Sequence, residues 1–172
     1  GHLWETRVVG SAAKPRVRTT GEIVRDGRAM AVPRSAPWDT GDDADLPIDP
    51  YILGLWLGDG DSRNATITAS LDDVAGTMAE IESRGYTATL SRTAPGDAAC
   101  IYVSLPGSHR NRFSPVKGLK VRLREAGLLG DKHVPAAYLR SSLSQRAELL
   151  RGLMDSDGSV SSRNPKAATF AN

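Results

Sequence analysis

Two short segments stand out in the pattern of apolar and polar residues along the chain. Residues 51–61 read YILGLWLGDGD, and residues 149–159 read LLRGLMDSDGS. The first is apolar on nearly every side, which predicts a helix buried in the core rather than one lying on its surface. Asp49 and Pro50 form a suitable N-cap and first-turn pair for this helix.

Between these two segments the pattern changes to an alternation with a period of two. Residues 65–70, 86–93 and 100–105 alternate apolar and hydroxyl side chains, which predicts antiparallel strands with one apolar and one polar face. Pro95-Gly96-Asp97 predicts a hairpin turn. Such a polar face is typical of ordinary solvated sheets and equally of sheets that read the DNA major groove. Its candidate DNA contacts are Thr66, Thr68, Thr87, Thr89, Ser91, Arg92, Tyr102 and Ser104.

Three further stretches predict helices. Residues 71–86 are amphipathic and end at Gly85, and a second helix starts at Val116. Residues 142–155 predict the helix of the second apolar segment, with Ser144 as a candidate cap. Antiparallel strands alternating with helices predict an α/β (α+β) fold in which sheets are backed by helices.

The composition divides the chain into three parts. Residues 1–50 hold a basic N-terminal segment, with a short strand expected at 29–32, and an acidic, proline-rich linker. Residues 51–141 form a first half built on the first apolar helix. Residues 142–172 hold the second apolar helix and the start of a shortened second half.

Both apolar helices carry small residues four positions apart. Small residues at this spacing share one face of a helix and let another backbone approach closely. The two helices should therefore pack together through these positions, namely Gly54, Gly58, Gly152 and Ser156. Each helix then stops at an Asp-Gly pair, with the glycine as its C-terminal stop. Asp59 and Asp157 should consequently meet at one end of the pair.

Two neighbouring carboxylates at helix C-termini are unfavourable without a cation, because the helix dipole is already negative there. A divalent metal, Mg²⁺, is the simplest explanation of such a pair. One Asp-Gly segment alone would favour an unrelated turn. Two copies whose aspartates are 98 residues apart favour a shared site.

At these residues the sequence resembles the LAGLIDADG homing endonucleases that are embedded in inteins. ILGLWLGDG (52–60) and LRGLMDSDG (150–158) are similar to the paired motifs of that family, and DKHVPAAYL (131–139) resembles the block before the second motif. The resemblance covers about residues 46–158. It implies saddle-like antiparallel sheets, two motif helices packed at a pseudo-twofold interface, and Mg²⁺-dependent hydrolysis of both strands of a specific double-stranded DNA site.

The resemblance also assigns roles to individual residues. Asp59 and Asp157 match the catalytic, metal-binding aspartates, and Lys132 matches a lysine that the family uses near the scissile phosphate. A surface lysine without a catalytic role is the alternative reading of Lys132. The partners implied are double-stranded DNA and a flanking intein splicing domain in the parent protein.

The sequence departs from the family pattern in two places. Only fourteen residues follow Gly158, so we expect an incomplete second half and weak or absent cutting unless a missing segment is restored. No nucleophile block opens the chain and no His-Asn pair ends it, so we expect no protein splicing. His2 falls near the place of a splicing-block histidine, and Lys166 is a poor candidate for a second catalytic lysine.

The net charge of +2 hides a strong segregation along the chain. Residues 1–34 carry a net charge of +4, residues 35–100 carry −9, and residues 101–151 carry +7. A polyanion would therefore meet the first and third segments. The candidate phosphate contacts in the third segment are Arg110, Arg112, Lys117 and Lys120. Each of them could equally belong to a solvated surface.

Compartment and competing functions follow from what the sequence lacks. The single Cys100 forbids an internal disulfide, and no secretory signal or membrane-length apolar run is present, so we expect a cytoplasmic protein. The DSDGS segment does not match a calcium loop, and three histidines and one cysteine are too few for an HNH or His-Cys nuclease. The serious rivals are a non-cleaving DNA- or RNA-binding relative, decayed or maturase-like, and a purely structural insert in an intein.

Overall fold

The computed structural model describes residues 2–39, 41–93, 98–108, 116–160 and 168–170. The chain divides into two compact units, Gly1–Trp38 and Asp39–Asn172. Residues 39–50, which the sequence assigned to a linker, therefore fall in the second unit. Each unit is described by itself.

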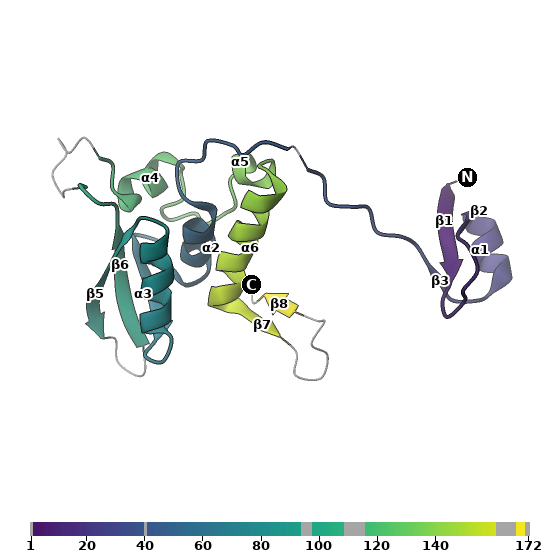
Figure 1. The fold of residues 1–172 in the computed structure, drawn as a ribbon, viewed down its shortest axis with the longest axis horizontal. Coiled ribbons are helices and arrows are strands. Elements are labelled where there is room, and N and C mark those ends of the chain that lie inside the picture. Colours follow the sequence, from purple (N-terminus) through teal and green to yellow (C-terminus); the bar gives the residue numbers. More distant parts are fainter. Residues whose placement is uncertain (1, 40, 94–97, 109–115, 161–167, 171–172) are drawn as a thin grey trace. The chain divides into compact units, whose positions relative to one another are not determined.

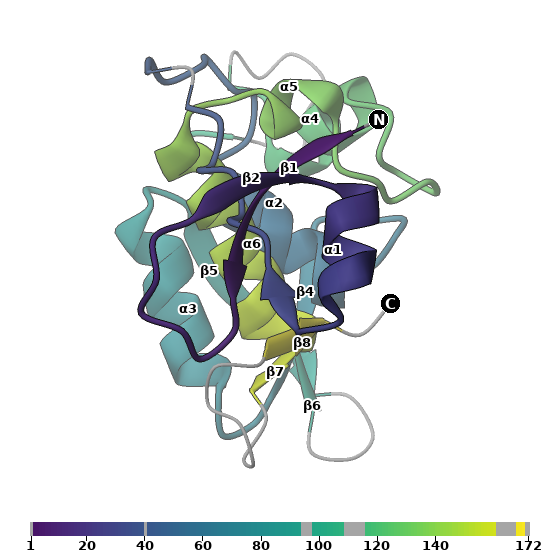
Figure 2. The same cartoon turned by 90° about the vertical axis from the view of Figure 1, so that its right-hand side faces the viewer.

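The first unit is a small antiparallel sheet with one helix. Its strands are β1 (Leu3–Val8), β2 (Arg16–Thr19) and β3 (Met30–Ala31), in the order β2-β1-β3. Helix α1 (Thr20–Asp26) follows β2 directly and is closed by a capping box between Thr19 and Glu22. Figure 2 shows this helix beside its strands.

The sequence predicted only the strand at 29–32 in this unit. Among its described residues Thr6 alone is buried, so there is little amphipathic pattern from which β1 or α1 could be read.

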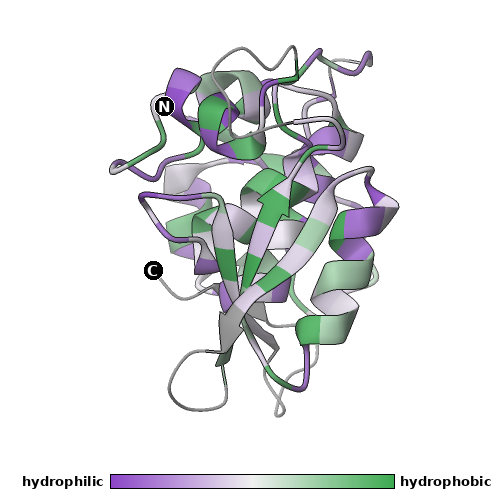
Figure 3. Ribbon diagram, turned by 90° about the vertical axis from the view of Figure 1, so that its left-hand side faces the viewer, coloured by the Kyte–Doolittle hydropathy of each residue, from purple (hydrophilic) through white to green (hydrophobic). Residues whose placement is uncertain are grey.

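The main sheet of the second unit has the alternating faces that the sequence predicted. Strands β4 (Thr66–Ser70), β5 (Thr87–Thr93) and β6 (Ala98–Ser104) pair antiparallel in the order β4-β6-β5. Ile67 stands opposite the buried Ile101, and Thr66 stands opposite Tyr102. Opposed residues point to the same side of a sheet, so one face is apolar and the other carries the hydroxyls. Figure 3 looks onto this sheet with helices behind it.

The helices in the described part of the second unit are α2 (Pro50–Asp59), α3 (Val74–Ser83), α4 (Leu119–Glu125), α5 (Ala136–Leu139) and α6 (Leu143–Asp157) (Figure 1). Strands β7 (Gly158–Val160) and β8 (Ala168–Phe170) form a separate antiparallel pair. The core lies between the apolar face of the main sheet and α2, α3 and α4, and α6 packs along α2. The predicted mixed fold of antiparallel sheets and helices is confirmed.

The segment before α2 caps α6 rather than acting as a free linker. Asp43 accepts hydrogen bonds from the hydroxyls of Ser142 and Ser144, and the main chain of Ala44 pairs with the side-chain amide of Gln145. Ser142, not Ser144, is the N-cap, because its hydroxyl accepts a hydrogen bond from the main-chain N–H of Gln145. An acidic group at a helix N-terminus is also favoured by the helix dipole.

In the described part of the chain, no helix is long and apolar enough to cross a membrane.

Candidate functional site

The contact between α2 and α6 is made backbone to backbone. A Cβ atom added to Gly54 would lie 2.2 Å from the Leu149 carbonyl oxygen, and one added to Gly152 would lie 2.2 Å from the Tyr51 carbonyl oxygen. Real Cβ contacts are never this short, so both positions require glycine at this helix separation. The two chains approach closely because neither helix has a side chain there.

The same contact continues to the last turns of the two helices. A Cβ on Gly58 would lie 2.0 Å from Ser156 Oγ and 3.4 Å from Asp157 Oδ2. Gly58 therefore makes room for the end of α6. The structure thus brings Gly54, Gly58, Gly152 and Ser156 into one contact.

This contact sets the positions of Asp59 and Asp157, which are the last residues of their helices. Asp157 Oδ2 would lie 3.4 Å from a Cβ on Gly58, the residue before Asp59, and the two carboxyl groups interact electrostatically. Burial, and then the charge of Asp157, raise the pKa of Asp59, while the charge of Lys132 lowers it. The two carboxyl groups share one electrostatic site, in which ionising both is unfavourable without a cation.

The donor set fits Mg²⁺. This ion usually takes one or two carboxylates and keeps several water ligands, whereas structural zinc takes four protein ligands. Within the described residues no cluster of three or more His, Cys, Asp and Glu side chains occurs. Two adjoining carboxyl groups, one with a raised pKa, match the one or two carboxylates that Mg²⁺ needs.

Lys132 reaches the same end of α2 from the segment between α4 and α5. Its ammonium donates to the carbonyl oxygens of Leu57 and Gly58, at 3.2 and 3.1 Å. Burial lowers the pKa of Lys132, while the charges of Asp157, Asp59 and Asp61 raise it. The ammonium therefore lies at a helix C-terminus, where the dipole favours a cation, and within electrostatic range of both motif aspartates.

Gly60 directly follows the last residue of α2, as the sequence predicted. Its φ and ψ are −79° and 147°, an extended conformation that other residues also adopt. A Cβ at Gly60 would lie 2.3 Å from the Trp56 carbonyl oxygen and 2.4 Å from Cδ1 of Trp56. The position therefore requires glycine because the main chain and the indole of Trp56 pass close to it.

Asp59 is open to a pocket that also reaches the main sheet. The pocket holds about 210 Å³ and is lined by Asp59, Ser156, Asp155 and the β4 residues Thr68 and Ser70, among others. A predicted catalytic carboxylate and a predicted DNA-contacting hydroxyl therefore line one cavity.

The predicted DNA contacts fall into two groups. Six share the polar face of the main sheet: Thr66, Thr68, Thr87, Thr89, Tyr102 and Ser104. Ser91 lies at the bulge of β5 and donates its hydroxyl to the Cys100 carbonyl. Arg92 pairs with Cys100 in the strand register, and its side chain lies outside the described part.

The predicted phosphate contacts lie on and before α4 rather than on the strands. Lys117 pairs with Glu125 at 2.7 Å, and Lys120 donates to the side-chain oxygen of Asn64. Arg110 and Arg112 lie outside the described residues.

The loop after α2 carries side chains that sequence reasoning missed. The Asp61 carboxylate accepts a hydrogen bond from the Arg63 main-chain N–H at 2.8 Å and one from the Asn64 side-chain NH₂ at 3.1 Å. Lys120 donates to the side-chain oxygen of Asn64. The Trp56 indole donates to the Asn64 carbonyl at 2.8 Å. An aspartate followed two and three residues later by its partners is a local turn signal that could have located this loop.

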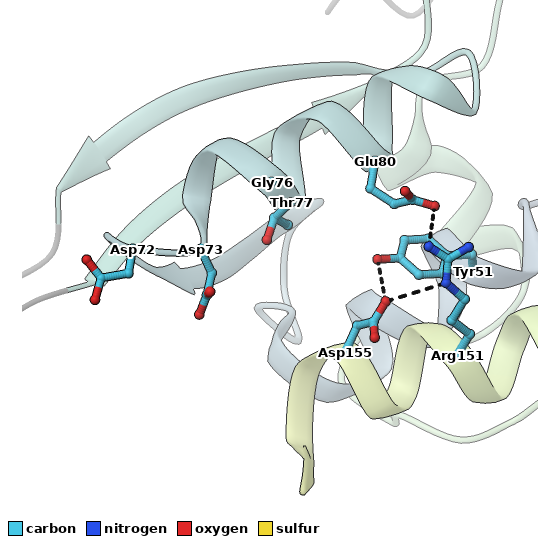
Figure 4. Close-up of a pocket in the computed structure, with 8 residues that line it drawn as sticks. All are labelled: Tyr51, Asp72, Asp73, Gly76, Thr77, Glu80, Arg151 and Asp155. Carbon is cyan, nitrogen blue, oxygen red and sulfur yellow. Dashed lines mark hydrogen bonds and ion pairs between the residues drawn. The ribbon is translucent and has the colours of Figure 1, made fainter. Parts of the chain in front are cut away.

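A second polar cluster holds the other end of the contact (Figure 4). Tyr51 donates to Asp155 at 3.1 Å. The guanidinium groups of Arg84 and Arg151 both lie over its ring, 4.1 and 5.0 Å from the ring centre. Glu80 bridges both arginines at 3.0 Å. Burial, and then Asp155, raise the pKa of Tyr51. Tyr51, Glu80, Arg151 and Asp155 line a pocket of about 350 Å³ between α3 and α6, and the cluster ties both helices to α2.

The fold and site together define a mixed α/β protein with paired carboxyl groups at two packed helix ends. No family model matches the sequence. The chain is 35% identical over 151 residues to a protein of Mycobacterium intracellulare described as replicative DNA helicase DnaB. The match takes in 84% of this chain and 21% of that protein, so the chain spans about a fifth of its relative's length.

Proposed function

We propose that the chain is the endonuclease part of an intein, a site-specific nuclease of the LAGLIDADG type that hydrolyses double-stranded DNA with Mg²⁺. The observation that carries this proposal is the contact of α2 with α6, which brings the carboxyl groups of Asp59 and Asp157 to the same end of the two helices, where they interact electrostatically. A structural insert without chemistry would have no need of two adjoining acidic groups.

The comparison agrees with an insertion in a larger host. An intein-borne endonuclease is a segment within another protein, and a match limited to 21% of a helicase is what such an arrangement would give. We therefore infer a helicase of this kind as the host and a splicing domain as the neighbour in the parent chain.

Each residue of the site has a role in this proposal. Asp59 and Asp157 would hold Mg²⁺ through carboxylate oxygens; the bound ion would polarise a phosphodiester and acidify a water molecule. Lys132 donates two of its three N–H groups to Leu57 and Gly58, and within the described residues the third is left for a phosphate oxygen. That contact would stabilise the negative charge that grows on the phosphate.

The polar sheet face and α4 would supply the DNA contacts. Hydroxyls of β4, β5 and β6 stand on one face of a three-stranded sheet, which suits contacts with base edges in the major groove. Lys117 and Lys120 would contact phosphates, and each such contact makes the slope of log K against log salt steeper by about 0.9.

Nicking of supercoiled plasmid DNA in Mg²⁺ and in EDTA tests the proposal. Mg²⁺-dependent nicking should fall by about a hundredfold or more in Asp59→Asn and in Asp157→Asn, because each removes an expected metal ligand. Asp72→Asn, which changes an exposed aspartate outside α2 and α6, is the matched control and should nick normally.

The other outcomes separate the rival functions. Salt-sensitive DNA binding with no nicking, by the chain and by the intact parent protein alike, would identify a non-cleaving binder, and no binding at all would identify a structural insert. Nicking that survives both substitutions would overturn the assignment of the two aspartates.

A further inference from the structure

Trp56 contacts the Lys132 ammonium from the interior of α2. The Trp56 side chain is fully buried, and the centre of its ring lies 5.1 Å from Lys132 Nζ. A cation within about 6 Å of the centre of an indole ring is attracted by the negative charge of the ring face. Lys132 is therefore held by an aromatic face as well as by two carbonyl oxygens.

The indole itself is fixed on its other sides. Its Nε1–H donates to the Asn64 carbonyl at 2.8 Å, and Gly60 lies so close that a Cβ there would be 2.4 Å from Trp56 Cδ1. A ring fixed by a hydrogen bond, by a close backbone contact and by full burial cannot turn away from the ammonium. It is a rigid support for a flexible side chain.

Such a support matters because a lysine side chain is mobile. Fixing its rotamers costs conformational entropy. Without support, the ammonium would spend much of its time in solvent instead of beside Asp59 and Asp157, with which it interacts electrostatically. A positioned lysine meets a phosphate without first having to be ordered.

We propose that Trp56 is a positioning residue that holds the Lys132 ammonium at the C-terminal end of α2, beside Asp59 and Asp157. The consequence for catalysis rests on the proposed nuclease function, whereas the anchoring does not. The equivalent position in α6 is Met154, which has no ring to attract a cation. The anchor therefore distinguishes the first motif from the second.

The anchoring is tested by NMR of the full chain with ¹³C-labelled lysine. The Hε protons of Lys132 should be shifted upfield by the ring current of Trp56, apart from those of the other four lysines, and Lys132→Met assigns the signal. Trp56→Leu should abolish the shift and Trp56→Phe should reduce it. A Lys132 signal at the ordinary position in the unsubstituted chain would overturn the proposal.

The positioning role is tested by plasmid nicking in a double-mutant cycle. Trp56→Phe should lower kcat by about two- to fivefold with KM for DNA unchanged, as expected for weakening one cation–π contact. In the Lys132→Met background the same substitution should have no further effect. An equal loss in both backgrounds would mean that Trp56 only supports the fold, and would overturn the positioning role.

Two safeguards keep the outcomes distinct. If Trp56→Leu does not fold, site-specific fluorinated tryptophan keeps the shape and the N–H group while weakening the ring's attraction for a cation, and Hε proton mobility should rise with fluorination. Unchanged mobility would count against the anchor. If neither the unsubstituted chain nor the intact parent protein nicks DNA, the proposed function fails, and the spectra still decide the anchoring.

Discussion

The two motif helices have the same spacing of small residues but different surroundings. In α2 every residue from Tyr51 to Trp56 is buried, whereas in α6 only Leu149 and Gly152 are buried and Leu150 is 58% exposed. Their shared face is built alike, with glycine opposite backbone in both directions. The comparison teaches that the small residues determine how closely the two helices pack, whereas the remaining positions determine whether each helix is buried or exposed on its other sides.

The ends of the two helices differ in the same way. At equivalent positions α2 has Trp56, Leu57 and Gly58 where α6 has Met154, Asp155 and Ser156. The end of α2 is thus apolar and supports Lys132, whereas α6 turns a carboxylate toward Tyr51. The predictions below test how far the two helices are interchangeable, from the largest expected effect to the smallest.

Alanine at either central glycine should separate the helices. Gly54→Ala and Gly152→Ala should each lower the free energy of unfolding by about 3 kcal/mol, because the new Cβ meets main-chain atoms that cannot move aside. Gly76→Ala on α3, where nothing lies within 4 Å, is the control and should raise stability by about 0.5–1 kcal/mol. Urea titration followed by circular dichroism measures both. Equal effects at positions 54 and 76 would contradict the close contact.

Alanine at Gly58 should be milder and repairable. The Cβ would meet the Ser156 side chain rather than backbone, so Gly58→Ala should lower stability by about 1–2 kcal/mol. Adding Ser156→Gly removes the clashing atoms and should restore most of the loss, whereas Ser156→Ala keeps its Cβ and should restore only part. The same unfolding measurement on the two double variants shows whether Ser156→Gly restores more stability than Ser156→Ala. Additive losses would show that these residues do not share a contact.

Removing the Tyr51 hydroxyl should loosen only the polar side of the contact. Tyr51→Phe keeps the ring under the two guanidinium groups but loses the hydrogen bond to Asp155, which lowers the free energy of unfolding by about 1 kcal/mol. In an Asp155→Ala background the same change should have a smaller effect, because the bond is already gone. An unchanged effect there would locate the loss elsewhere.

The smallest effect concerns the charge of Asp59. Its pKa is raised in the folded chain above the value of about 4 in the unfolded chain, so without metal the stability should fall as pH rises through the interval between the two. Asp59→Asn should remove this decline and be more stable at pH 7 in EDTA, by less than about 1 kcal/mol because water screens this partly exposed pair. Melting temperatures between pH 4 and 7 test the sign. Mg²⁺ should stabilise the unsubstituted chain more than the variant.

Part of this architecture could be predicted from local pattern. Small residues four apart predicted which faces of the two apolar helices meet, and the alternation near Thr66 and Ile101 predicted the faces of the main sheet. These features repeat along the sequence with the period of a helix or a strand, so the pattern records them.

The rest depends on contacts between residues that are distant in sequence. Lys132 meets Trp56 across 76 positions, and no periodicity connects them. Ser142 takes its capping role because Asp43 arrives from another part of the chain. In the first unit the strands were missed for another reason. A sheet with almost no buried side chain has no alternation of apolar and polar residues that the sequence could show.

One side chain has consequences for the whole of the second unit. The guanidinium of Arg84 binds Asp49 at the start of α2, Glu80 on α3 and Glu148 on α6, and also covers the Tyr51 ring. A planar group with five donors can satisfy several directions at once, whereas an ammonium is a single compact charge. Arg84→Lys would therefore break the contacts that join α2, α3 and α6 at this side chain, because one ammonium cannot replace the guanidinium in all of these directions.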